Sequence, residues 1–262
     1  MTRYRRLPME TLFNARDIGG YATMDGKVTK YGRFIRSELP CNLSEKDSQF
    51  LRDYGVKLTL DFRTDFEVNA LPCCLMSGHP WQKYVRSAMS DKQSEPPIPE
   101  KNSETKKSNP ALDFLNPDWI QIYLAIAENG KSWVKNNMEI AAGIDGAILY
   151  HCMTGKDRTG LFTAMLLGLC NCYPSDIIAD YSISQINLRP FYLKMMRFPE
   201  MLNEKGEPDL TLRFYQTNPE NMFAFLQYID EKYGSMTAYL TSCGIAEETL
   251  RKIADSLTEE AM

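Results

Sequence analysis

The residue types best suited to chemistry gather in one run, residues 151–160, which reads HCMTGKDRTG. In this run five residues separate Cys152 from Arg158. The short apolar stretch 147–150 before it predicts a buried strand, and the apolar stretch 158–171 after it predicts a buried helix. The run is therefore expected to form the loop between a strand and a helix.

A loop of this kind can bind an anion. Successive backbone N–H groups converge where a helix begins, and the helix dipole favours negative charge there. Gly155 permits a sharp bend, and the planar guanidinium of Arg158 can bind two oxygens of one phosphate. The phosphate-binding residues that we predict are Met153, Thr154, Gly155, Lys156, Asp157, Arg158 and Thr159.

Cys152 would lie in the same positive field, which favours the thiolate form of a cysteine. A thiolate can attack the phosphorus of a phosphate ester and form a cysteinyl-phosphate, which water then hydrolyses. The loop amides and Arg158 would stabilise charge on the equatorial oxygens in both steps. The hydroxyl of Thr159 could hydrogen-bond the sulfur as it leaves. The predicted chemistry is hydrolysis of phosphomonoesters with no metal or other cofactor.

Other interpretations of the run fit less well. A nucleotide-binding loop needs glycine where Tyr150 stands and serine or threonine where Asp157 follows the lysine. A zinc site built from His151 and Cys152 is disfavoured because adjacent strand side chains point to opposite faces. We expect His151 to bond the loop backbone instead. An inert buried cysteine remains the plainest alternative, and the matching Arg158 argues against it.

The run resembles the signature His-Cys-x5-Arg-Thr of the cysteine-dependent protein tyrosine and dual-specificity phosphatases. Its longer form resembles an atypical bacterial branch that also acts on phosphoinositides. Further stretches resemble motifs of that branch, namely 14–21, 36–39, 60–64 and 233–240. The resemblance covers nearly the whole chain. It implies an α/β phosphatase fold with a central, mainly parallel mixed sheet flanked by helices.

The resemblance also gives roles to the two charged residues before Arg158. A lysine at the place of Lys156 is associated in phosphoinositide phosphatases with more highly phosphorylated substrates. An aspartate at the place of Asp157 has been proposed as the general acid, which protonates the leaving oxygen. The alternative for Asp157 is an ion pair that orients Lys156 or Arg158.

Asp61 is the rival candidate for the general acid. It ends an apolar strand, and ligand sites of α/β folds usually lie at such strand ends. Its alternative role is a salt bridge with Arg63 or a cap for the helix that follows. The sequence leaves both questions of role open.

Length, composition and charge limit the possible domain organisation, partners and location of the protein. With 262 residues and 44% hydrophobic residues, the chain can form one large catalytic domain, 1–262, or a domain with an inserted cap. A net charge of −4 gives no reason to expect nucleic-acid binding. The basic N-terminus is not followed by an apolar stretch, and the sequence has no run long and apolar enough to span a membrane. We therefore expect a cytoplasmic protein without membrane insertion. Export after removal of a signal is the alternative. The seven cysteines show no metal-binding spacing and suit a reducing compartment.

Residues 90–110 differ from the rest of the chain. Serine, lysine, glutamate and proline dominate them. The segment is too long for an ordinary connection, so it is expected to be a lid or a disordered insertion.

Periodicity and capping residues predict the elements around the loop. We expect a hairpin over 26–36 and strands over 56–62 and 81–86. Helices are expected over 44–54, 64–70, 117–129, 131–142, 158–171, 174–187, 219–233, 235–242 and 246–258. Residues 189–217 could form a cap over the site or a core beneath a loop.

Together these features predict a phosphatase whose leading substrate is phosphotyrosine in proteins. Phosphoinositides and phosphoserine or phosphothreonine are secondary possibilities that rest on Lys156. A catalytically silent phosphate-binding module is the alternative from another class. A rhodanese-like or arsenate-reductase-like sulfur enzyme is disfavoured by Thr159 and Gly160 after the arginine. The oligomeric state is left open.

Overall fold

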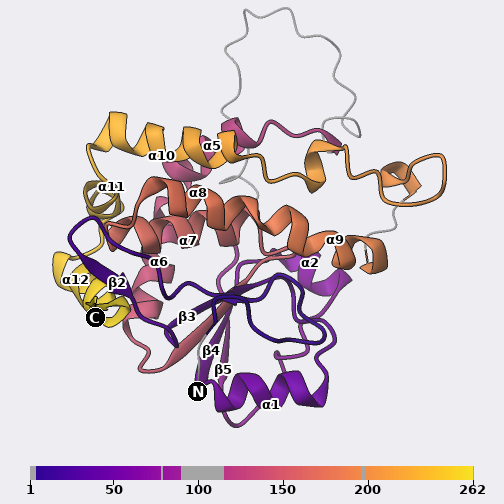
Figure 1. The fold of residues 1–262 in the computed structure, drawn as a ribbon, viewed down its shortest axis with the longest axis horizontal. Helices are drawn as coiled ribbons and strands as arrows, with labels where there is room; N and C mark the ends of the chain where they lie inside the picture. The colour runs from indigo at the N-terminus through magenta and orange to yellow at the C-terminus, as the bar shows by residue number, and fades with distance from the viewer. Residues whose placement is uncertain (1–3, 78, 90–114, 196–198, 262) are drawn as a thin grey trace, which may run out of the picture.

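The computed structural model describes residues 4–77, 79–89, 115–195 and 199–261. Its centre is a sheet of five strands in the order β1-β3-β6-β4-β5 (Figure 1). These strands are β1 (Arg16–Asp17), β3 (Phe34–Ser37), β6 (Ala147–His151), β4 (Val56–Asp61) and β5 (Lys83–Arg86). Strand β1 is antiparallel to β3, and every other neighbouring pair is parallel. The predicted α/β fold with a mainly parallel mixed sheet is confirmed.

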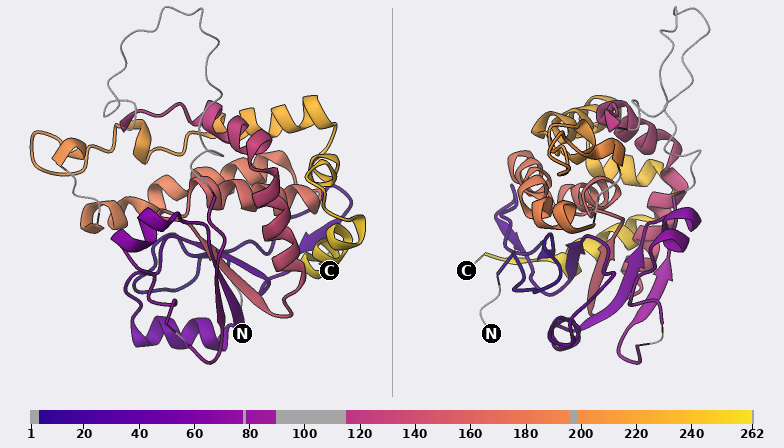
Figure 2. Two further views of the ribbon diagram at one scale, coloured as in Figure 1. Left: turned by 180° about the vertical axis from the view of Figure 1, so that it is seen from behind. Right: turned by 90° about the vertical axis from the view of Figure 1, so that its right-hand side faces the viewer.

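Helices cover both faces of this sheet. They are α1 (Glu45–Asp53), α2 (Asp65–Ala70), α5 (Trp119–Asn129), α6 (Lys131–Ala142), α7 (Asp157–Leu169), α8 (Pro174–Ser182), α9 (Ser184–Met195), α10 (Pro219–Tyr233), α11 (Met236–Ser242) and α12 (Glu247–Leu257). Figure 1 shows α1 on one side of the sheet and α7, α8 and α10 on the other. Seen from behind, α5 and α6 lie in front of α7 and α8 (Figure 2).

Strand β6 separates two cores because successive side chains alternate between faces. Ile148 and Tyr150 face the larger core, which α5–α7 and α10–α12 complete. Ala147 and Leu149 face the smaller core beside α1. Both ends of the loop 152–156 are thus held by buried structure, because α7 is itself buried from Thr159 to Leu167.

Most of the predicted elements are present within a residue or two of their expected bounds. Ser44 caps α1 and Thr64 caps α2, each by accepting a hydrogen bond from a backbone N–H in the first turn. Gly234 ends α10 in the left-handed conformation. Helix α5 begins later than expected, after Asp118 as its cap.

The predicted hairpin over 26–36 is wrong. Strand β2 (Lys27–Thr29) pairs instead with β7 (Thr258–Glu260) in a separate two-stranded sheet, while β3 joins the central sheet. Gly32, with φ of 84°, lies between the two strands. Gly32 does mark a turn, but the strands on either side of it belong to different sheets.

The predicted helix over 174–187 is two helices, since α8 ends at Ser182 and α9 begins at Ser184. Beyond α9, two single turns follow, η1 (Pro199–Met201) and η2 (Arg213–Tyr215). A small apolar core joins α9 to these turns. The segment 90–110 lies outside the described residues. Within the described chain, no helix is long and apolar enough to cross a membrane.

Candidate active site

The loop 152–156 connects β6 to α7, as the sequence predicts. Cys152 follows the last residue of the strand and is buried. Gly155 bends the loop with φ of +67°, a conformation that L side chains rarely adopt. A Cβ atom at this position would lie 2.1 Å from the carbonyl oxygen of Ser37 at the end of β3. Glycine is therefore needed for both the bend and the close approach.

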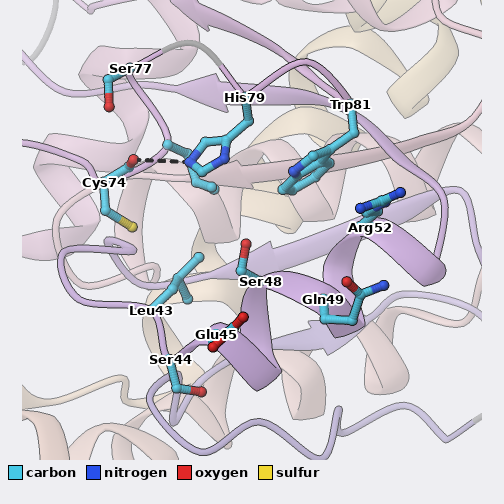
Figure 3. Close-up of a pocket in the computed structure, with 11 residues that line it drawn as sticks. Leu43, Ser44, Glu45, Ser48, Gln49, Arg52, Cys74, Ser77, His79 and Trp81 are labelled. Carbon is cyan, nitrogen blue, oxygen red and sulfur yellow. Dashed lines mark hydrogen bonds between the residues drawn. The ribbon is translucent and has the colours of Figure 1, made fainter.

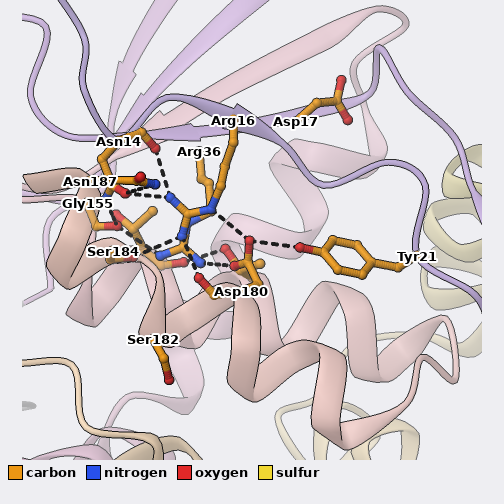
Figure 4. A network of polar contacts seen from close by, with 12 residues as sticks. Asn14, Arg16, Asp17, Tyr21, Arg36, Gly155, Asp180, Ser182, Ser184 and Asn187 are labelled. Carbon is orange, nitrogen blue, oxygen red and sulfur yellow. Dashed lines mark hydrogen bonds and ion pairs between the residues drawn. The ribbon is translucent and has the colours of Figure 1, made fainter. Parts of the chain in front are cut away.

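A buried ion-pair network supports the loop from beneath (Figure 4). Asp180 of α8 binds Arg16 of β1 at 2.7 Å and also pairs with Arg36 of β3. The second terminal nitrogen of Arg36 donates to the carbonyl oxygen of Gly155 at 2.9 Å. Burial alone would raise the pKa of Asp180, but the two arginines lower it to about 2. The network thus ties β1, β3 and α8 to the turn of the loop.

The carbonyl groups of residues 153–155 accept hydrogen bonds from other elements of the fold. The carbonyl oxygen of Met153 accepts from the N–H of Leu39 at 3.0 Å. The side-chain amide of Asn14 contacts the carbonyl oxygens of Thr154 and Gly155 at 3.4 and 3.3 Å. Because these partners hold the carbonyl groups outward, the opposite side of the loop is left to the backbone N–H groups.

The backbone N–H groups of residues 153–156 donate no hydrogen bond to any part of the chain that the structure describes. Unpaired buried amides are rare in folded proteins. Amides in a strand-to-helix loop, at the positive end of a helix dipole, form a site for an anion. The loop therefore has the donor arrangement that the sequence predicts for phosphate binding.

Arg158 is fixed by an ion pair that the sequence analysis did not predict. Its two terminal nitrogens donate to the carboxylate oxygens of Glu67 on α2 at 2.7 and 2.5 Å. One of them also donates to the carbonyl oxygen of Phe62 at 3.1 Å. Burial alone would lower the pKa of Arg158, but the hydrogen bonds of Glu67 raise it above its ordinary value. The guanidinium is therefore charged and locked in place.

Asp61 ends β4 and is completely buried. Its carboxylate forms a two-point ion pair with Arg63 and accepts a hydrogen bond from Tyr84 at 2.6 Å. Burial alone would raise the pKa of Asp61, but His151, Arg63 and Tyr84 together lower it. Both oxygens of Asp61 are thus engaged by protein groups, including the salt bridge with Arg63 foreseen as its alternative role.

His151 bonds the loop backbone, as expected. Its Nδ1 lies 2.9 Å from the carbonyl oxygen of Cys152, so this nitrogen carries the hydrogen. Burial lowers the pKa of His151, while the neighbouring carboxylate of Asp61 acts to raise it. The ring therefore shapes the start of the loop.

Lys156 and Asp157 lie together where α7 begins. The ammonium of Lys156 is 3.0 Å from Oδ2 of Asp157, and the hydroxyl of Tyr123 donates to Oδ1 at 2.6 Å. The Asp157 side chain is 16% exposed, whereas that of Asp61 is 0% exposed. Lys156 is buried and lies over the ring of Trp119, 4.1 Å from its centroid. Of the two candidate acids, only Asp157 has contact with solvent.

Comparison with known proteins identifies the family. Residues 7–259 match the tyrosine phosphatase family. The chain belongs to this family. The match spans every residue of the loop and of its scaffold, so the geometry described above is that of a tyrosine phosphatase family member.

Three bacterial relatives are similar over most of their length. A protein of Cupriavidus necator named provisionally as a tyrosine-protein phosphatase is 25% identical over 89% of this chain and 82% of its own. A tyrosine-protein phosphatase of Nostoc commune is 26% identical over 84% of this chain and 72% of its own. The triple specificity protein phosphatase PtpB of Mycobacterium tuberculosis is 24% identical over 92% of this chain and 95% of its own.

Several residues of this phosphatase family site went unrecognised in the sequence. Glu67 stands three residues after Thr64, and the two form a capping box in α2. That pattern was readable, but its second use as the partner of Arg158 was not. Tyr123, inside an apolar helix, resembled an ordinary core residue.

The hydroxyl of Thr159 is buried and has no hydrogen-bond partner in the described part of the chain. The bond to sulfur expected from the sequence is therefore not formed in this structure. The role of Thr159 toward the sulfur therefore stays a prediction.

A separate hollow lies between α1 and the segment 74–81 (Figure 3). Arg52 and Trp81 line it, and the ring of His79 lies 3.4 Å from the carbonyl oxygen of Cys74. No residue of the loop 152–156 lines this hollow, so it is not part of the candidate site.

Proposed function

We propose that this chain is a protein tyrosine phosphatase that hydrolyses phosphomonoesters through a cysteinyl-phosphate at Cys152, without a metal. The observation that supports this most strongly is the set of unpaired loop amides, 153–156, directly after the cysteine. The carbonyl groups of residues 153–155 accept hydrogen bonds from other elements, which leaves the amides available as preorganised donors for phosphate oxygens.

Arg158 has N–H groups left over that can complete the phosphate site. A guanidinium has five N–H groups, and Glu67 and Phe62 together accept three hydrogen bonds from the two terminal nitrogens. The N–H of Nε and one N–H of a terminal nitrogen remain. These two lie on one edge of the guanidinium and form a second fork, which fits two oxygens of a phosphate.

In the first step the thiolate of Cys152 attacks phosphorus. The sulfur–phosphorus bond forms as the bond from phosphorus to the ester oxygen breaks, and a proton passes to that oxygen. In the second step water attacks phosphorus and gives its proton to the carboxylate that acted as the acid in the first step, the sulfur–phosphorus bond breaks, and the thiolate is restored. The amides and Arg158 stabilise the oxygens in both steps.

Asp157 is the better general acid of the two candidates. It starts α7, borders the phosphate loop and keeps some contact with solvent. Asp61 is completely buried, and Arg63 and Tyr84 hold its carboxylate. A group that must release and regain a proton needs access to the leaving oxygen and to water, which favours Asp157.

Phosphotyrosine in proteins is the proposed main substrate, and no nucleic acid or inserted membrane segment takes part. The name of the M. tuberculosis relative, triple specificity protein phosphatase, supports a range of more than one substrate class. Phosphoserine, phosphothreonine and phosphoinositides are therefore proposed as secondary substrates. In this chain Lys156 is engaged by Asp157 and Trp119. A second substrate phosphate must therefore compete with those contacts, which supports phosphotyrosine as the better substrate.

The test is a set of initial rates on a phosphotyrosine peptide, a phosphoserine peptide and soluble phosphoinositides, with a chelator present. Wild-type protein is compared with Cys152→Ser, with Cys243→Ser as the matched control, since Cys243 is also a buried free thiol but stands at the end of α11. Turnover that survives chelation and requires Cys152 supports the proposal. Phosphate binding without any turnover would favour a silent phosphate-binding module.

A further inference from the structure

One buried tyrosine reaches the candidate acid from a different helix. The hydroxyl of Tyr123, in the first half of α5, lies 2.6 Å from Oδ1 of Asp157, the first residue of α7. We propose that Tyr123 is a positioning residue that fixes Asp157 as the general acid and stabilises the carboxylate left after proton transfer. The inference rests on the proposed function and names a further residue that this function requires.

Tyr123 is the last member of a directed chain of hydrogen bonds. The side-chain amide of Asn221 on α10 donates to the hydroxyl oxygen of Tyr181 on α8 at 3.3 Å, and the hydroxyls of Tyr181 and Tyr123 lie 2.8 Å apart. Each hydroxyl has a single hydrogen. Because Asp157 as a carboxylate can only accept, Tyr123 must donate to it, and Tyr181 must donate to Tyr123. The hydrogen of every bond in this series therefore points toward Asp157.

Packing holds this series of hydrogen-bonded side chains rigidly. The Tyr123 side chain is completely buried, and its ring packs edge-to-face on Tyr181 with an interplanar angle of 88°. The ring of Tyr181 in turn packs on α7, where a Cβ atom at Gly160 would lie 3.0 Å from it. Burial also raises the pKa of Tyr123 well above its ordinary value, so its hydroxyl keeps its hydrogen at working pH.

Two other groups contact the carboxyl group of Asp157. Tyr123 donates to Oδ1, and the ammonium of Lys156 lies 3.2 Å from Oδ1 and 3.0 Å from Oδ2. When the ester bond breaks, the acidic proton of Asp157 moves to the leaving oxygen and Asp157 becomes a carboxylate. A hydrogen bond to a charged acceptor is about twice as strong as one to a neutral acceptor. The bond from Tyr123 thus strengthens during the step, which lowers the barrier.

The experiment compares Tyr123→Phe with Tyr239→Phe. Tyr239 is also buried, and its hydroxyl bonds α5 through the carbonyl oxygen of Ala127 at 3.0 Å. The control therefore removes the same atom and loosens the same helix, but it leaves Asp157 untouched. Both variants are assayed on a phosphotyrosine peptide, whose phenol needs a proton to leave, and on 2,4-dinitrophenyl phosphate, whose phenolate leaves without one.

For Tyr123→Phe we expect kcat on the peptide to fall by about tenfold or more, with a much smaller loss on the dinitrophenyl ester, because general-acid help amounts to about 10²–10⁴-fold. Tyr239→Phe should show no such selectivity. In the double variant with Asp157→Asn, the loss on the peptide should not exceed that of Asp157→Asn alone, since both residues act on one step. Additive losses, or equal losses on both substrates, would overturn the role of Tyr123.

If Tyr123→Phe does not fold, Tyr181→Phe gives the same test, since it removes the donor behind Tyr123. It should show the same selectivity with a smaller loss, and no selectivity would contradict the proposal. A wild-type protein that hydrolyses neither substrate would refute the phosphatase function itself. Cys152-dependent turnover without selectivity in these variants would refute only the role of Tyr123.

Discussion

Arg158 and Glu67 form a two-point ion pair across 91 residues of sequence, with N–O distances of 2.7 and 2.5 Å. The pair joins α7 to α2 and sets the plane of the guanidinium. A planar fork binds a second carboxylate or phosphate well only in one orientation. Glu67 therefore decides whether the free edge of Arg158 faces the phosphate site.

Replacing Glu67 by Gln tests this relationship. Gln keeps the shape but offers one acceptor in place of two, so we expect kcat/KM for a phosphotyrosine peptide to fall by about tenfold, the equivalent of about 1.4 kcal/mol. Glu139→Gln is the control, because Glu139 pairs with Lys135 on the surface. A loss no larger than that of the control would show that Arg158 needs no such partner.

Replacing Arg158 by Lys keeps the charge and removes the fork. Lysine cannot pair with Glu67 and bind two phosphate oxygens in one plane. We expect kcat to fall by about 10²–10³-fold, as when a preorganised transition-state donor is lost. Steady-state kinetics with wild-type and variant protein measure this directly, and a loss below about tenfold would argue against a bidentate role.

Asp180→Asn tests the network beneath the loop. Because it leaves Arg16 and Arg36 buried without their counter-charge, we expect a loss of stability of about 3–5 kcal/mol. In the wild type the pKa of Asp180 is lowered to about 2. Its stabilising contribution is therefore complete above its unfolded pKa of about 4 and is lost as pH falls from there toward 2.

Urea unfolding of both proteins between pH 7 and pH 2 checks this expectation. The difference in unfolding free energy should be largest near neutral pH and should shrink below about pH 4. A difference that stayed constant down to pH 2 would mean that Asp180 is not the counter-charge of the two arginines.

Gly155→Ala should damage the phosphate site. The new Cβ atom would lie 2.1 Å from the carbonyl oxygen of Ser37, so the loop must move away from β3. We expect a stability loss of about 1–3 kcal/mol and weaker binding of inorganic phosphate by calorimetry. Gly206→Ala is the control, because Gly206 also has a positive φ but open space around it. Equal phosphate affinity in both variants would contradict the proposed loop geometry.

Much of the fold was readable from local signals. Ser44 and Thr64 marked helix starts and Gly234 marked a helix end, since a cap depends only on neighbouring residues. The pairing of β2 with β7 was not readable because it joins residues far apart in the chain. The break at Ile183 between α8 and α9 was missed for lack of a glycine or proline there.

The candidate site also combines residues that the sequence reveals with residues that it does not. The residues from Cys152 to Thr159 follow from one contiguous motif, whose spacing is set by the loop itself. Their partners come from other elements, and Glu67 and Tyr123 meet them only in the folded chain. Sequence also left Asp61 and Asp157 open as acids, because burial and hydrogen bonding of a carboxylate depend on distant residues such as Tyr84.

The covalent intermediate is the central claim, and trapping it is the most direct test. Wild-type protein is mixed with a phosphotyrosine peptide in the presence of a chelator, quenched in acid within one turnover, and digested for mass analysis. We predict one added phosphoryl group on the peptide that contains Cys152, and none in Cys152→Ser. Rapid turnover with no phosphoryl group on Cys152, or turnover that persists in Cys152→Ser, would contradict the account.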